Sequence, residues 1–99
     1  MVIVTNITFP TESAKQVGEC FLKVPPLPEY MTRKGPYISS NNIDGVKSLS
    51  IYELDNARLA DGMIVLGEYM TGFFDVTGFA YEVKAYTEIE EGLKMIGLA

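Results

Sequence analysis

The sequence contains no histidine, no tryptophan and only one cysteine, Cys20. A single cysteine cannot form an internal disulfide, and without histidine or paired cysteines the usual zinc and transition-metal ligand sets are missing. Oxygen ligands remain, but Asp55, Asp61 and Asp75 do not have the loop spacing of a calcium or magnesium site. We therefore expect neither a metal site nor a cofactor.

Basic residues are also scarce, because eight lysines and arginines stand against thirteen acidic residues, which gives a net charge of −5. Counterion release from a phosphate backbone would not favour such a chain, so neither nucleic acid nor an anionic membrane is an expected partner. The longest apolar run, 63–67, is too short to span a bilayer, and no secretory leader pattern begins the chain. With the lone cysteine, these absences predict a cytoplasmic protein.

Hydrophobic residues, in contrast, make up 47% of the 99 residues, while charged residues make up 21%. This balance indicates a folded domain and excludes intrinsic disorder. The length fits a single domain over residues 1–99. A domain this small buries only about 60–65% of the surface of its unfolded chain, so burial by association would stabilise it.

The elements are predicted to follow the order β-α-β-β-α-β. Strands are indicated by β-branched residues and two-residue alternation, and helices by apolar residues three and four apart. The predicted elements are a strand over 2–9, a helix over 11–24, an extended connection over 25–36, strands over 37–40 and 46–54, an apolar helix over 55–73, a strand over 79–86 and a short tail helix over 87–96.

The two faces of the predicted sheet differ in polarity. The apolar face is expected to carry Ile3, Ile7, Phe9, Leu49, Ile51, Phe79, Tyr81 and Val83, and the mixed face Val2, Val4, Asn6, Ser48, Ser50, Tyr52, Leu54, Glu82, Lys84 and Tyr86. Helices covering the apolar face would give an α+β ferredoxin-like sandwich, an antiparallel sheet with helices on one face. The mixed face suits packing on a second sheet, so we expect a homodimer, with a higher oligomer as a further option.

Local motifs in the second half of the chain add to this pattern. A strand ends in Glu53, Leu54 and Asp55, the apolar helix ends in Phe73, Phe74 and Asp75, and a strand of the form FAYEV leads to an acidic tail. With the element order, these features resemble the ferredoxin-like dimeric α/β barrel superfamily, and within it small uncharacterised bacterial members. The resemblance implies that two sheets pack face to face.

Known activities of that superfamily include cofactor-independent quinone-forming monooxygenases, heme-degrading monooxygenases, lactone isomerases and dye-decolourising peroxidases. The heme branches use an axial histidine, which this chain lacks. The resemblance therefore leaves cofactor-independent chemistry, with ligands held between sheet and helices.

Six residues are candidates for a site. Glu53 would lie at a strand end on the apolar face, where a partly buried carboxylate suits general acid or base work, and Tyr81 would share that face. The candidate ligand-binding residues are Asn6, Arg33, Tyr52 and Tyr69. Four of these residues also have a structural explanation: an interface amide for Asn6, dimer packing for Tyr52, a core position for Tyr81, and an exposed strand end or an ion pair with Arg58 or Lys84 for Glu53.

Three hypotheses follow. The first is a dimeric protein that binds a small apolar or aromatic ligand in a pocket between sheet and helices, closed by the 25–36 connection. The alternative is a cofactor-independent monooxygenase or isomerase acting on a small cyclic or aromatic compound. The third is a structural oligomerisation module built on the apolar second helix.

Overall fold

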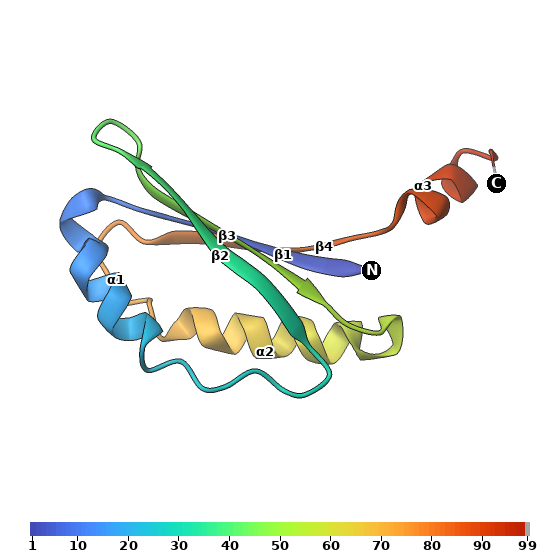
Figure 1. The fold of residues 1–99 in the computed structure, drawn as a ribbon, viewed down its shortest axis with the longest axis horizontal. Coiled ribbons are helices and arrows are strands. Elements are labelled where there is room, and N and C mark those ends of the chain that lie inside the picture. Colours follow the sequence, from blue (N-terminus) through green and yellow to red (C-terminus); the bar gives the residue numbers. More distant parts are fainter. Residues whose placement is uncertain (99) are drawn as a thin grey trace.

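The structure, a computed structural model that describes residues 1–98, has one four-stranded antiparallel sheet and three α-helices (Figure 1). The elements are β1 (Val2–Phe9), α1 (Ala14–Phe21), β2 (Thr32–Asn41), β3 (Gly45–Glu53), α2 (Leu59–Thr71), β4 (Ala80–Tyr86) and α3 (Ile89–Met95). Short 3-10 turns, η1 (Thr11–Ser13) and η2 (Asn56–Arg58), precede α1 and α2. Each predicted strand and helix is therefore present; β1 has the predicted ends, and the ends of the others are shifted.

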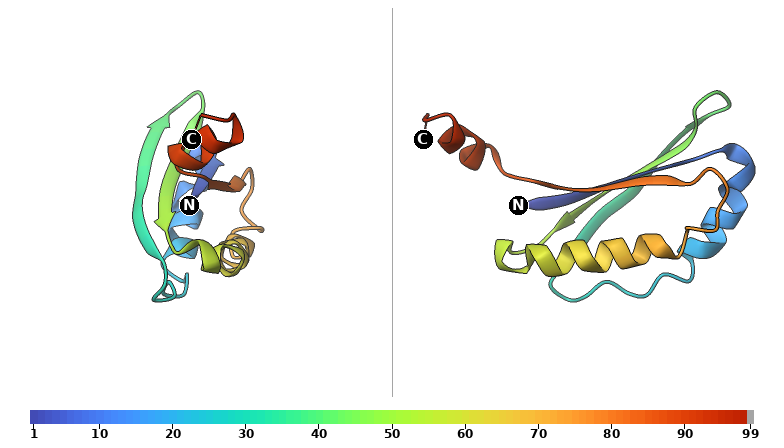
Figure 2. Two further views of the ribbon diagram at one scale, coloured as in Figure 1. Left: turned by 90° about the vertical axis from the view of Figure 1, so that its right-hand side faces the viewer. Right: turned by 180° about the vertical axis from the view of Figure 1, so that it is seen from behind.

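The strands lie in the order β2-β3-β1-β4, and every neighbouring pair is antiparallel. Helix α1 joins β1 to β2 and α2 joins β3 to β4. Both helices lie on the same side of the sheet (Figures 1 and 2). The α+β class is confirmed, and the arrangement is compatible with a ferredoxin-like fold.

The core consists of two groups of buried side chains between the sheet and these helices. One group joins β1 and β3 to the middle of α2 through Ile3, Met31, Tyr52 and Leu66. The other joins β1 to α1 and to the chain after α2 through Phe9, Val17, Phe73 and Val76. Burial of these side chains is the main force that holds the helices on the sheet.

Helix α2 is apolar over most of its circumference, as predicted. Leu66 and Met70 are buried against the sheet, and Val65 and Tyr69 pack at the edges of the core. Ile64 is left on the outer side, with 61% of its surface exposed. None of the helices in residues 1–98 has the length and apolarity needed to cross a membrane.

The predicted faces of β3 are wrong, although those of β1 and β4 are right. Residues directly opposite each other in an antiparallel pair share a face. Across β1 and β3 the opposed pairs are Ile3 with Tyr52, Thr5 with Ser50 and Ile7 with Ser48. The face of β3 toward the helices therefore carries Ser48, Ser50 and Tyr52, and the other carries Leu49, Ile51 and Glu53.

The prediction failed because both faces of β3 carry polar and apolar residues, so polarity does not identify the buried face. Leu49 and Ile51 were expected in the core because they are the more apolar set. Alternation divides a strand into two sets of residues, but only the pairing register determines which set is turned inward. Here the inward set is held by large groups at its two ends, Val46 opposite Phe9 and Tyr52 opposite Ile3.

Strand β2 is ten residues long, much longer than the predicted 37–40. Its pairing with β3 shifts by one residue between Lys34 and Tyr37, which is a β-bulge. Arg33 lies opposite Tyr52 before the bulge, and Ile38 lies opposite Ser48 after it. The extra residue therefore turns both Arg33 and Ile38 toward the helices.

We call the sheet surface turned away from α1 and α2 the open face. At its centre lie Val4, Tyr37, Leu49 and Ile51, which are neighbours in the strand register. Helix α3 does not cover this face but stands off the end of β4 (Figures 1 and 2). The radius of gyration is 15.3 Å, whereas a compact domain of this length has one of about 13 Å. The fold is therefore elongated, and no helix in the described part of the chain covers the open face of its sheet.

Candidate ligand-binding cavity

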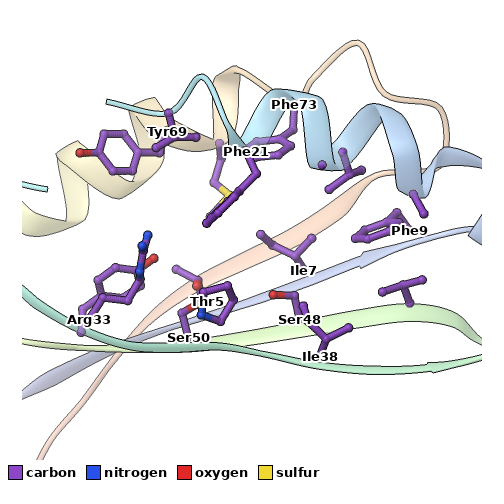
Figure 3. Close-up of a pocket in the computed structure, with 18 residues that line it drawn as sticks. Thr5, Ile7, Phe9, Phe21, Arg33, Ile38, Ser48, Ser50, Tyr69 and Phe73 are labelled. Carbon is purple, nitrogen blue, oxygen red and sulfur yellow. The ribbon is translucent and has the colours of Figure 1, made fainter. Parts of the chain in front are cut away.

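A cavity of about 350 Å³ lies between the sheet and the two helices (Figure 3). Its floor is formed by β1, β3 and β2, and its roof by α1 and the end of α2. Figure 3 shows Thr5, Ser48 and Ser50 on the sheet side, with Phe21 and Tyr69 on the helix side. The cavity therefore lies between the two layers of the fold.

The cavity exists because the sheet carries small side chains beneath the helices. Thr5, Ser48 and Ser50 are neighbours on adjoining strands, since Thr5 lies opposite Ser50 and Ser48 lies one step further along β3. Large groups at either end, Tyr52 and Phe9, reach the helices and hold them at a distance that the hydroxyl residues cannot fill. Protein interiors are otherwise packed with few voids larger than a water molecule.

The three floor hydroxyls are free to interact with a ligand. None of the side-chain hydrogen bonds found in residues 1–98 involves Thr5, Ser48 or Ser50. In the same residues, no fully buried side-chain nitrogen or oxygen is left without a partner. The hydroxyl oxygens are therefore reached from the cavity, and they offer a row of donors and acceptors there.

The cavity opens to solvent between α1 and β2. Its exposed lining residues all belong to these two elements, namely Ala14, Gly18, Phe21, Arg33 and Ile38. The lining residues from β1, β3 and α2 are buried or half-buried. Arg33 spans this mouth, because its guanidinium carbon lies 5.6 Å from the centre of the Phe21 ring. Such a contact is a cation–π interaction.

At the Arg33 end, two tyrosines also line the cavity. The Tyr69 hydroxyl donates a hydrogen bond of 2.7 Å to the carbonyl oxygen of Pro26. The pKa of Tyr69 is raised, chiefly because burial disfavours the phenolate and also because Tyr52 lies nearby, whereas Arg33 acts in the opposite direction. The Tyr69 hydroxyl is therefore protonated at neutral pH, where it acts as a hydrogen-bond donor and does not act as a general base.

The connection that was expected to close the cavity follows a different path. It runs beside α2 (Figure 1). The Tyr69 hydroxyl holds it there by its hydrogen bond to Pro26, and Met31 is buried in the core. Of residues 25–36, only Arg33 and Pro36 line the cavity, and both belong to β2.

The structure brings together three of the six predicted site residues. Arg33, Tyr52 and Tyr69 all line the cavity. Asn6 does not, because it lies on the open face opposite Leu49 and Glu82. Its side chain borders a shallow hollow there with Tyr37 and Leu49.

Glu53 and Tyr81, the predicted catalytic pair, lie on opposite faces of the sheet. Glu53 belongs to the open face. Its carboxylate forms an ion pair with the Lys34 ammonium, with 2.6 Å between Oε1 and Nζ, and its side chain is 49% exposed. The pKa of Lys34 is raised, mainly by this hydrogen bond. Tyr81 faces the helices near the sheet edge, stacked on Phe74 and 41% exposed. The burial and proximity on which an acid–base pair depends are both absent.

The residues that sequence reasoning missed are the hydroxyl floor and the aromatic roof. The sequence did contain an indication of the floor. Residues 46, 48, 50 and 52 share one face of β3 by alternation, and there the larger Val46 and Tyr52 flank the small Ser48 and Ser50. That pattern fits a floor held open at its ends. The bulge that turns Ile38 inward has no comparable signal in the sequence.

Residues 1–98 contain no group of three or more histidine, cysteine, aspartate or glutamate side chains placed to hold a metal ion. No protein-family model matches the chain, and no curated protein or solved structure is significantly similar to it.

Proposed function

We propose that this chain binds a small, largely apolar molecule in the cavity between its sheet and helices, and that it does so as a homodimer. The observation that carries the proposal is the floor of Thr5, Ser48 and Ser50. Large apolar residues at these positions would fill the space and strengthen the core, yet the chain has small polar ones.

The size and lining of the cavity support a small ligand. A volume of about 350 Å³ lies at the lower end of the range of about 300–1,000 Å³ for ligand sites. The walls are mostly apolar, with Phe9, Phe21 and Phe73 among them, and a few polar groups meet on one side. This is the usual composition of a site that binds by burial and orients by hydrogen bonds.

The side chains that line the cavity favour a binding function over a catalytic one. Among residues 1–98, no carboxylate, cysteine or histidine lines the cavity. Its tyrosines offer hydrogen bonds, and Tyr69 already uses its proton on Pro26. A monooxygenase or isomerase that relies on Glu53 and Tyr81 gains no support from their positions.

Filling the floor tests this proposal. The probe is 2-naphthamide, a small neutral aromatic compound. We expect Ser50→Leu to bind it at least about tenfold more weakly than the wild type does, because the leucine side chain would occupy part of the cavity. The free energy of unfolding should rise by about 0.5–2 kcal/mol, since filling a cavity adds buried apolar contacts. The measurements are an NMR titration of backbone amides and urea unfolding.

The matched control is Ser39→Leu, which makes the same change at an exposed position of the open face. It should leave the binding of 2-naphthamide unchanged. The proposal is wrong if both variants bind 2-naphthamide equally well, or if the wild-type amides around the cavity shift neither with 2-naphthamide nor with its anionic isostere 2-naphthoate.

The open face supports the homodimer. Its centre of Val4, Leu49 and Ile51 is apolar, and charged pairs surround it, with Lys34 to Glu53 at 2.6 Å and Lys84 to Glu82 at 3.3 Å. An apolar centre with a polar rim is the anatomy of a protein interface. Two copies joined through this face would form the dimeric α/β barrel that the sequence resemblance implies.

A charge at the centre of the open face tests the dimer. We expect Leu49→Glu to convert a dimer into a monomer in sedimentation equilibrium, because two glutamates would be buried near the symmetry axis. Leu49 is 37% exposed, so the substitution should not disturb the monomer core. Ile43→Glu, at the tip of the β2–β3 hairpin and 89% exposed, is the control and should remain dimeric. A wild-type monomer, or a dimeric Leu49→Glu variant, would refute this interface.

A further inference from the structure

We propose that the ligand of this cavity is an aromatic monocarboxylate, held with its ring among the phenylalanines and its carboxylate toward Arg33. This inference rests on the proposed binding function and specifies its ligand class. Three observations support it: the sign of the charge at the cavity, the polarity gradient along it and its size.

The charge at the cavity is opposite to that of the whole chain. The chain carries a net charge of −5, yet among the described residues Arg33 is the one charged side chain that lines the cavity. None of the ion pairs found in residues 1–98 includes Arg33. Its guanidinium instead stands over the Phe21 ring at 5.6 Å, at the mouth. A cation without a carboxylate partner at the mouth of an apolar cavity favours an anionic ligand group.

Two of the three floor hydroxyls, those of Thr5 and Ser50, lie in the half of the cavity nearer to Arg33. Figure 3 shows Thr5 and Ser50 on the floor between Arg33 and Ser48, whereas Phe9 lies at the far end of the cavity. A carboxylate near Arg33 can accept a forked pair of hydrogen bonds from the guanidinium and further ones from the two hydroxyls. The ligand would therefore bind with its anionic group at this end and its apolar body toward Phe9.

The apolar end favours a flat ring. Phe9 and Phe73 belong to the same buried group, and the Phe73 ring stacks on Phe79 at a centroid distance of 5.0 Å. Aromatic rings gain from offset or edge-to-face contact with other rings beyond the gain from burial. The volume equals that of about twelve water molecules in the liquid, which fits a ligand of one or two rings with a carboxylate.

The test compares 2-naphthoate, which is an anion at pH 7, with its neutral isostere 2-naphthamide. We expect the wild-type protein to bind the carboxylate about tenfold or more tightly than the amide in calorimetric titrations. Arg33→Gln should remove this preference by weakening the binding of the carboxylate far more than that of the amide, and Arg33→Lys should retain part of it. Arg58→Gln, which removes the same charge outside the cavity, should preserve the preference in full.

The possible outcomes separate the two proposals. If the amide binds as tightly as the carboxylate, or if Arg33→Gln keeps the preference, the anion inference is wrong and the binding function stands. If neither compound shifts the amides around the cavity, the binding function itself is wrong. A loss of preference in Arg58→Gln as well would show that the net charge, and not Arg33, selects the anion.

Discussion

Leu66→Ala is expected to lower the free energy of unfolding by about 3–5 kcal/mol, as the loss of a fully buried leucine side chain does. Leu66 has 0% of its surface exposed and lies in the middle of α2, in the group that joins Ile3 and Tyr52 to the helix. Removing its side chain leaves a void that these neighbours cannot close without moving the helix. Urea unfolding followed by circular dichroism measures the change.

Ile64→Ala is the matched control for this variant. It removes an aliphatic side chain of the same size from the same helix, two residues away, but on the outer side where 61% of the residue is exposed. We expect it to cost less than about 1 kcal/mol. Equal losses in the two variants would mean that Leu66 does not carry the contact between α2 and the sheet.

Gly45→Ala is expected to lower the free energy of unfolding by roughly 2–4 kcal/mol, for two reasons that add. Gly45 has a φ of +81°, a conformation that alanine rarely adopts. A Cβ atom there would also lie 2.5 Å from the backbone oxygen of Phe9, which is too close for two non-bonded atoms. Since a backbone oxygen cannot rotate away, the start of β3 would have to separate from β1.

Gly67→Ala provides the contrast for Gly45→Ala. Gly67 lies within α2, and a Cβ atom there would meet nothing within 4 Å. Alanine is favoured over glycine inside a helix by about 0.5–1 kcal/mol, so this variant should be more stable than the wild type. If both glycine variants shift the urea midpoint in the same direction, the steric explanation for Gly45 is wrong.

Local patterns in the sequence predicted the elements well because they depend on neighbouring residues. Pro10 and Pro25 bound the segment that contains α1, and the alternation over 46–54 marks β3. The first half of β2 was missed because Thr32, Arg33 and Lys34 have no strand-like alternation. They become a strand only because β3 offers them a partner.

The lining of the candidate cavity was predicted in part, and the reason is again that local patterns do not determine long-range pairing. Arg33, Tyr52 and Tyr69 were identified by side-chain type and do meet in one cavity. Glu53 was placed with the wrong neighbours because its position depended on which face of β3 is turned inward. That choice is made by long-range pairing with β1, which no local pattern encodes.

The mouth of the cavity has a consequence for the speed of exchange. Arg33 and Phe21 meet there through their side chains, one from β2 and the other from the end of α1. Rotation of exposed side chains takes picoseconds to nanoseconds, far less than the time needed to move a loop or a domain. A molecule that bound in the cavity as proposed could therefore enter and leave without a conformational step of the backbone, and its residence time would be set by the strength of its contacts.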